Sequence, residues 1–189
     1  WMHGTPGARR QIPFEARAYA EQHGLRIIGI DRPGIGSSTP HLYPQLLDWA
    51  GDLELLLDAL AVDTVRLVGL SGGGPYVLAA GAALGERVQG IAVLGGVAPV
   101  LGPDAAAGGV IQLAKWLSPL LRAGRGPLGV ALTQLIRLAR PVAGPGLDLY
   151  AAVQPPGDKN LLGRPEFKAM FLDDLLNGSR FQTSAPIHD

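Results

Sequence analysis

The stretch TVRLVGLSGGGP, residues 64–75, decides the fold of this chain. It begins with a short, largely apolar run, Val65 to Leu70, which is typical of a buried strand. Ser71 and three glycines follow, and Pro75 then opens an apolar segment that ends at Gly85. Proline is well suited to the first turn of a helix. The stretch therefore predicts a strand, a tight turn and a helix in direct succession, with Ser71 at the turn.

The same alternation of strands and helices continues on both sides of this stretch. Short apolar runs predict strands, and longer segments with apolar residues on one face predict helices. Alternating strands and helices are typical of an α/β fold with a doubly wound, mostly parallel sheet. The further expected strands are residues 1–3, 25–30 and 91–94, and the further expected helices are residues 11–22 and 44–60.

The pattern changes after Pro99. Residues 104–189 contain apolar segments broken by glycine and proline, and none of them predicts a strand. We therefore expect residues 1–100 to form the central part of the core and residues 101–189 to form a helical cap or lid. The expected helical segments are 113–121, 128–138 and 166–176, with connectors at 144–146 and 155–157.

Composition excludes several classes of function. The 189 residues carry a formal net charge of zero, which gives no basic face for nucleic acid. The absence of cysteine excludes disulfides, thiol catalysis and cysteine-ligated zinc. The four histidines lack metal-ligand spacing, and no metal or organic cofactor is expected. The longest apolar stretch, 88–101, is interrupted by glycine and is shorter than the ~20 residues of a membrane span. A cytoplasmic location is expected.

Gly69-Leu70-Ser71-Gly72-Gly73 matches the G-x-S-x-G pattern of a nucleophile elbow. With 27 glycines in the chain the pattern alone is weak, but its position between a strand and a helix is the setting that the elbow requires. The alternative is a glycine-rich turn with a solvent-exposed serine, or a phosphate-binding loop. The phosphate-binding loop is disfavoured because neither G-K-[ST] nor G-x-G-x-x-G occurs here.

Two more motifs precede the elbow, HGTPG at residues 3–7 and DRPGIGSS at residues 31–38. In order, spacing and placement at strand ends, the three resemble the signatures of the α/β-hydrolase superfamily: its H-G-x-P-G oxyanion turn, its D-x-x-G-x-G-x-S loop and its nucleophile elbow. The resemblance covers residues 1 to about 100 well.

The resemblance implies a role for each matching residue. Ser71 corresponds to the catalytic nucleophile, and the backbone N–H groups of Thr5 and Gly72 correspond to the oxyanion hole. His3 corresponds to a histidine that organises the loop and is not the catalytic base. Asp31 is expected to brace its loop through local hydrogen bonds.

The acid and base of a triad are not found by this reasoning. In the superfamily the order is Ser, then Asp or Glu, then His, and the only histidine after Ser71 is His188, with no strand before it. Asp104 is interpreted as a helix N-cap. Asp173, Asp174 and Asp189 are interpreted as solvated charges. We therefore expect a sequence truncated at both ends, whose acid and base follow residue 189 and whose hydrolytic activity is weak or absent.

The leading hypothesis is a serine hydrolase that acts on small, apolar carboxylic esters or related acyl compounds through an acyl-enzyme on Ser71. The alternatives are an aminopeptidase similar to proline iminopeptidase, a cofactor-free haloperoxidase, and a non-catalytic binding protein of the same fold. An acidic cluster would favour the peptidase, and Asp173-Asp174 is the only hint of one. Haloalkane dehalogenases and epoxide hydrolases are disfavoured because they carry aspartate in place of the serine. The sequence leaves the oligomeric state open.

Overall fold

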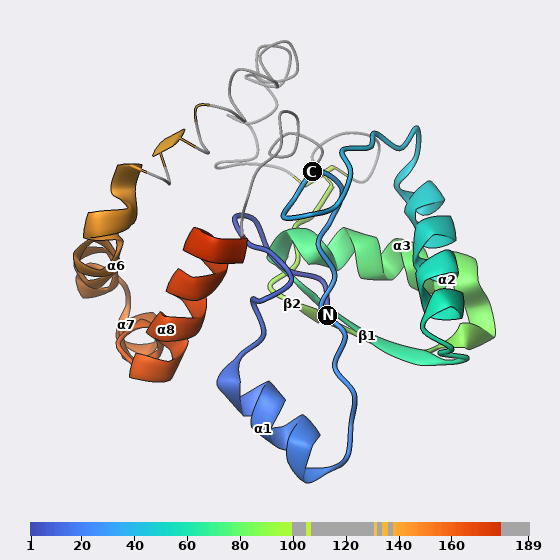
Figure 1. Ribbon diagram of the computed structural model, residues 1–189, viewed down its shortest axis with the longest axis horizontal. Coiled ribbons are helices and arrows are strands. Elements are labelled where there is room, and N and C mark those ends of the chain that lie inside the picture. Colours follow the sequence, from blue (N-terminus) through green and yellow to red (C-terminus); the bar gives the residue numbers. More distant parts are fainter. Residues whose placement is uncertain (100–104, 107–130, 132–133, 136–137, 179–189) are drawn as a thin grey trace.

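A computed structural model describes residues 1–99, 105–106, 131, 134–135 and 138–178 (Figure 1). The α-helices are α1 Phe14–Gln22, α2 Trp49–Ala59, α3 Gly74–Leu84, α6 Ala143–Ala152, α7 Pro156–Leu162 and α8 Pro165–Asp173. The strands are β1 Val65–Leu70 and β2 Val88–Leu94. Short 3-10 turns are η1 Leu46–Asp48, η2 Ser71–Gly73, η3 Gly85–Arg87 and η4 Arg140–Val142, and η5 Asp174–Gly178 is a π-helical turn.

The sheet is parallel, as predicted. β1 and β2 pair along their length, from Val65 with Val88 to Leu70 with Leu94. On the other side of β1, Met2 forms isolated parallel bridges with both Gly69 and Ile30. The Met2 N–H donates to Val68 O (2.8 Å), and the Leu70 N–H donates to Met2 O (3.0 Å). The order across the sheet is therefore residue 30, residue 2, β1 and β2, with β1 between residue 2 and β2.

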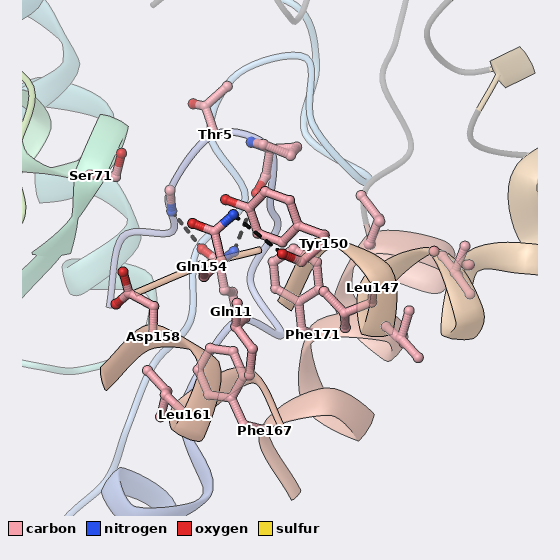
Figure 2. A pocket seen from close by; sticks show the side chains of 18 of the residues that line it. Thr5, Gln11, Ser71, Leu147, Tyr150, Gln154, Asp158, Leu161, Phe167 and Phe171 are labelled. Carbon is pink, nitrogen blue, oxygen red and sulfur yellow. Dashed lines mark hydrogen bonds between the residues drawn. The ribbon is translucent and has the colours of Figure 1, made fainter. Parts of the chain in front are cut away.

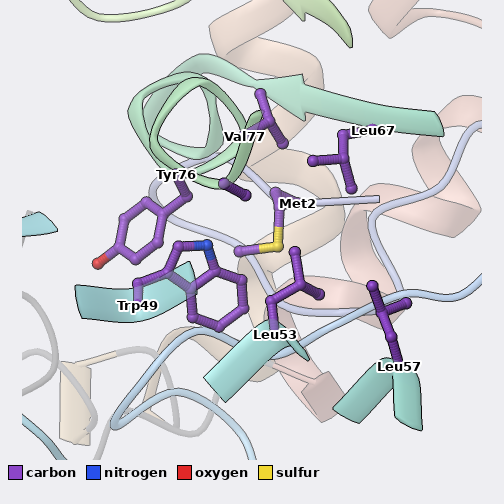
Figure 3. Close-up of a cluster of buried hydrophobic side chains, with 8 residues drawn as sticks. Met2, Trp49, Leu53, Leu57, Leu67, Tyr76 and Val77 are labelled. Atoms are coloured by element: carbon purple, nitrogen blue, oxygen red, sulfur yellow. The ribbon is translucent and has the colours of Figure 1, made fainter. Parts of the chain in front are cut away.

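One face of this sheet carries the hydrophobic core, which is built with α2 and α3 (Figure 3). Figure 3 shows the side chain of Met2 between residues of these two helices. The apolar stripe of α2 turns toward the sheet, whereas Leu55 on the opposite face of α2 is 68% exposed. The buried members of the core are Met2, Trp49, Leu53, Leu57, Leu67, Tyr76, Val77 and Ala80.

Three of the predicted strands differ from the expectation. Residues 1–3 and 25–30 form isolated bridges in place of strands, with Met2 bridged to Ile30 and to Gly69. β2 is longer than expected, but it is not buried: Ile91 is 41% exposed and Leu94 is 44% exposed. Within the described part of the chain, β2 is an edge strand that pairs with β1 alone.

The helices of residues 138–178, named here the C-terminal helical segment, form a separate group beside the sheet (Figure 1). As predicted, this described segment contains helices and no strand. The two expected connectors were wrong: residues 144–146 lie in the first turn of α6, and Pro156 begins α7. The first turn of a helix tolerates proline because its N–H groups have no partner within the helix. The expected segment 113–121 and most of 128–138 lie outside the described residues.

Core packing predicts contrasting effects for two leucines of α2. Leu57→Ala should lower the free energy of unfolding by about 2–5 kcal/mol, because Leu57 is 2% exposed and its loss leaves a cavity. Leu55→Ala is the matched control and should change it by less than about 0.5 kcal/mol. Urea denaturation followed by circular dichroism measures both values, and equal losses would contradict this description of the core.

Candidate active site

Ser71 lies at a strained turn between β1 and α3. Its φ angle is +47°, in the left-handed region that side chains other than glycine rarely adopt. The strain, on the order of 1–3 kcal/mol, is retained only where the surroundings impose the conformation. A Cβ atom at position 69 would lie 2.6 Å from Gly73 O, and one at position 73 would lie 2.5 Å from Met2 O. These glycines allow the turn to pack against its own strand and against residue 2.

The turn at residues 3–7 lies directly against Ser71. A Cβ atom at Gly4 would be 3.3 Å from Ser71 Cβ, and one at Gly72 would be 2.7 Å from Thr5 Oγ1. The three residues expected at the site, Thr5, Ser71 and Gly72, are therefore brought together. Gly72 is the second residue of η2, where helical N–H groups have no intrahelical acceptor.

Gln11 holds the shape of this turn. Its Oε1 accepts a hydrogen bond from the Gly4 N–H (2.7 Å), and its Nε2 donates to Pro6 O (3.2 Å). Gln11 is 6% exposed, and a Cβ atom at Gly7 would collide with its side chain. Sequence reasoning placed Gln11 at the start of a helix and assigned it no role, because no local pattern shows that a glutamine side chain turns back on the preceding loop.

Arg32 joins the turn to the elbow. Its guanidinium donates to Gly72 O (3.2 Å), to Gly4 O (3.1 Å) and to Thr5 Oγ1 (2.5 Å). The side chain is 1% exposed, and its guanidinium carbon lies 5.3 Å from the centre of the Tyr76 ring. Sequence reasoning missed this residue too. Its position inside the second motif was the only available signal.

His3 is a structural residue, as expected. It is fully buried, its Nδ1 lies 2.8 Å from Gly4 O, and its Nε2 lies 3.2 Å from the Arg32 N. These contacts fit a neutral ring that donates from Nδ1 and accepts at Nε2. Burial, together with the nearby Arg32 charge, lowers the pKa of His3 to about 3. Neither ring nitrogen is therefore available to take a proton from Ser71.

Asp31 forms the expected hydrogen bond within its loop, and it also bonds to a residue outside the loop. Its backbone carbonyl accepts from Ser38 Oγ (2.8 Å), which is the expected local bond. Its carboxylate also accepts from the Arg9 backbone N–H (2.7 Å) and from the Arg9 guanidinium (3.0 Å). Asp31 thus ties the second motif to the segment that follows the first.

A cavity of about 780 Å³ opens above Ser71 (Figure 2). Gly4, Thr5 and Ser71 line it from the core, and the C-terminal helical segment supplies most of the remaining wall. Figure 2 shows Tyr150, Phe167 and Phe171 grouped on the far side of the cavity from Ser71. The wall is mostly apolar, and Asp158 is the one acidic residue among its described lining residues.

The described residues bring no general base to Ser71. Both ring nitrogens of His3 make hydrogen bonds to the backbone. His23 is exposed at the end of α1, and His41 lines a separate cavity. His188, Asp104 and Asp189 lie outside the described residues. Among the described residues no group of acidic or histidine side chains could hold a metal ion, and no described helix is long and apolar enough to cross a membrane.

The expectation of solvated charges at Asp173 and Asp174 was wrong for Asp174. Asp173 is 41% exposed and pairs with Arg10 (3.1 Å). Asp174 is 1% exposed, and its carboxylate accepts a hydrogen bond from the Ala8 N–H (2.8 Å). The π-helical turn that begins at Asp174 points this residue inward. Neither aspartate lines the cavity, so they form no acidic cluster there.

The comparisons with known proteins agree with this architecture. A family model described as alpha/beta hydrolase fold matches residues 2–135. Among solved structures, the chain is similar to an alpha/beta hydrolase fold protein from Nakamurella multipartita, with 21% identity and a TM-score of 0.56. The match covers 98% of this chain and 61% of that protein, so the chain spans about three fifths of its length. The search of curated proteins gave no match.

The contacts of Arg32 predict a loss of stability when its donors are removed. Arg32→Met should lower the free energy of unfolding by about 1–3 kcal/mol, because it leaves the carbonyls of Gly4 and Gly72 without these donors in a buried place. The exposed Arg26 provides the control, and Arg26→Met should have an effect within about 0.5 kcal/mol. Chemical denaturation compares the two variants, and equal stabilities would contradict the role given to Arg32.

The low pKa of His3 predicts that its ring stays neutral in weak acid. The Hε1 signal of His3 in a proton NMR titration should stay constant from pH 8 down to about pH 4.5, since its pKa is about 3. Because this value lies below the 6.5 of a free histidine, the unfolded state binds more protons between these limits. His3 should therefore contribute stability that is lost as pH falls from 6.5 toward 3. A midpoint between pH 5 and 7 for this signal would contradict the burial described.

Proposed function

Because the chain belongs to the α/β-hydrolase fold family, we propose that it is a serine hydrolase that cleaves carboxylic esters or related acyl bonds through an acyl-enzyme on Ser71. One observation carries the proposal. Ser71 is held at φ +47° between a strand and a helix, and it lines a cavity beside Thr5 and next to Gly72. This is the setting in which a serine hydroxyl is exposed to a substrate carbonyl.

In the first half of the reaction, Ser71 Oγ attacks the carbonyl carbon, and its proton passes to a general base. A bond forms between Oγ and carbon, and the carbonyl oxygen takes on negative charge. The backbone N–H groups of Thr5 and Gly72 would donate to this oxygen. The tetrahedral intermediate then collapses, the bond to the alkoxide breaks, and the alcohol leaves with the proton. The product of this half is an acyl group on Ser71.

In the second half, water attacks the acyl carbon and releases the carboxylic acid and free Ser71. The same two N–H groups would stabilise the second oxyanion. The amino terminus of α3 follows Ser71 after one short turn, and its positive end adds to this stabilisation. The base that activates Ser71 and the water is not among the described residues. The proposal therefore requires a histidine and a supporting carboxylate from elsewhere in the protein.

The cavity supports an apolar acyl substrate. Its volume of about 780 Å³ is within the range of small-molecule sites. Leu147, Phe167 and Phe171 line it, and polar side chains such as Gln154 interrupt the apolar surface. Residues 101–189 would then act as a cap that covers the acyl group and excludes water. Asp173 and Asp174 do not line the described wall of the cavity, so they give no support to an aminopeptidase.

Replacement of Ser71 tests the proposal. The protein, expressed from its complete reading frame, should hydrolyse p-nitrophenyl esters, and Ser71→Ala should lower kcat/KM by at least about 10³-fold because the nucleophile is lost. The exposed Ser37 provides the control, and Ser37→Ala should retain the rate. A fluorophosphonate probe should label Ser71, which peptide mass spectrometry can identify.

Two results would contradict this function. One is turnover in Ser71→Ala equal to that of the wild type, which would place the nucleophile elsewhere. The other is a complete lack of ester hydrolysis and probe labelling in the whole protein, which would favour a non-catalytic binding protein of the same fold.

A further inference from the structure

The C-terminal helical segment contacts the core along α8. At the start of α8, Arg164 forms an ion pair with Glu15 of α1. At the end of α8, Asp173 pairs with Arg10 (3.1 Å), and Asp174 accepts a hydrogen bond from the Ala8 N–H (2.8 Å). The contacts at the end of α8 therefore fall on the segment that directly follows the turn carrying Thr5.

Of these contacts, the one made by Asp174 is buried. Arg164 and Glu15 are about half exposed, and Asp173 is 41% exposed, so their ion pairs are screened by water. Asp174 is 1% exposed, and the Ala8 N–H is a buried donor. A hydrogen bond from a backbone N–H to a buried carboxylate is charge-assisted and is stronger than one between neutral groups. The hydrogen bond of Asp174 is thus the most buried of these contacts between the C-terminal helical segment and the residues that follow the turn.

The backbone conformation at Asp174 favours a functional role for this contact. α8 ends at Asp173, and the chain continues as the π-helical turn η5. π-Helical turns are rare in proteins, and those that do occur are often found at functional sites. Here the turn directs a carboxylate into the interior, where burial of a charge is costly. A residue retained for stability alone would not need a charge at this position.

We propose that Asp174 is a positioning residue for the proposed oxyanion site. Its carboxylate holds the backbone of Ala8 and thereby fixes the turn whose Thr5 N–H would bind the oxyanion. Gln11 and Arg32 hold this turn from the core, and Asp174 holds Ala8, the residue that directly follows it, from the C-terminal helical segment. The inference rests on the proposed function for its catalytic meaning, whereas the coupling between Asp174 and Thr5 can be measured without any activity.

The surroundings of Asp174 set the pKa of its carboxyl group and therefore the pH range in which the charge-assisted bond to Ala8 forms. Burial, and then the nearby carboxylates of Asp31 and Asp173, raise the pKa of Asp174 to about 6, while the N–H groups of Ala8 and Arg10 favour its ionised form. Arg9 and Arg10 also face this region, but their side chains pair with Asp31 and Asp173. The carboxylate, and with it the strong bond to Ala8, should therefore be present above about pH 6 and lost below it.

An NMR titration from pH 4.5 to 8 tests the coupling directly. In the wild type, the amide signals of Ala8 and of Thr5 should both shift with one midpoint near pH 6. In Asp174→Asn neither signal should show this midpoint. Asp173→Asn is the matched control, because it removes the neighbouring charge without touching Ala8, and both signals should still titrate. If the Thr5 amide does not respond in the wild type, the contact is only local and the proposal is overturned.

Kinetics and stability together separate a positioning role from a structural one. For Asp174→Asn we expect kcat to fall on the order of tenfold at pH 7.5 with KM changed less than about twofold, since a charge-assisted bond is lost. The raised pKa means that the folded state binds more protons than the unfolded state between about pH 4 and pH 6. The wild type should therefore lose stability as pH rises across this window, whereas Asp174→Asn lacks this titrating group. The melting temperature of Asp174→Asn minus that of the wild type should accordingly increase with pH.

The two proposals fail in different ways. Loss of kcat together with a lower melting temperature at pH 7.5 would overturn the positioning role, because it indicates general damage to the fold. Unchanged kcat in Asp174→Asn would overturn it as well. Hydrolysis that survives in Ser71→Ala would overturn the proposed function alone, and the NMR result would still decide whether Asp174 and Thr5 are coupled.

Discussion

The site depends on the close approach of two backbone segments, the turn at residues 3–7 and the elbow at Ser71. This approach requires the absence of side chains: a single Cβ atom at position 72 would meet Thr5 Oγ1 at 2.7 Å, and one at position 73 would meet the backbone of Met2 at 2.5 Å. The parallel bridge between Met2 and Gly69 brings the two segments into register. The left-handed conformation of Ser71 then follows from this packing, because the surroundings over-determine it.

The glycines permit this approach, and buried polar side chains hold it. Arg32, His3 and Gln11 each pair with backbone groups of the turn, and Arg32 also pairs with the carbonyl of Gly72. Backbone groups buried in a loop need such partners because no ladder or helix satisfies them. The motif residues around Ser71 therefore form a scaffold of hydrogen bonds that fixes the positions of the turn and the elbow.

Features that depend on local sequence could be predicted, whereas hydrogen bonds between separate segments could not. The parallel pairing of β1 with β2, the position of Ser71 and the structural role of His3 were predicted from local periodicity, turn composition and three motifs. The strands expected at residues 1–3 and 25–30 are only isolated bridges. Arg32 and Asp174 were missed because their partners lie in distant segments, up to 166 residues away for Asp174 and Ala8. Gln11 was missed because no local pattern shows that its side chain turns back on the preceding loop. The exposure of β2 was missed because periodicity reports the preference of a run, not the number of strands beside it.

Asp174 places a buried charge beside the turn at residues 3–7, through its hydrogen bond from the Ala8 N–H. A carboxylate at 1% exposure lowers the stability of the folded chain at neutral pH, since its pKa is raised. An asparagine or an apolar residue would avoid that cost. The ionised form, however, makes a stronger bond to Ala8 than a neutral side chain could. In the proposed function, this stronger bond would hold the Thr5 N–H where negative charge develops, and a misplaced donor would weaken stabilisation of the oxyanion directly.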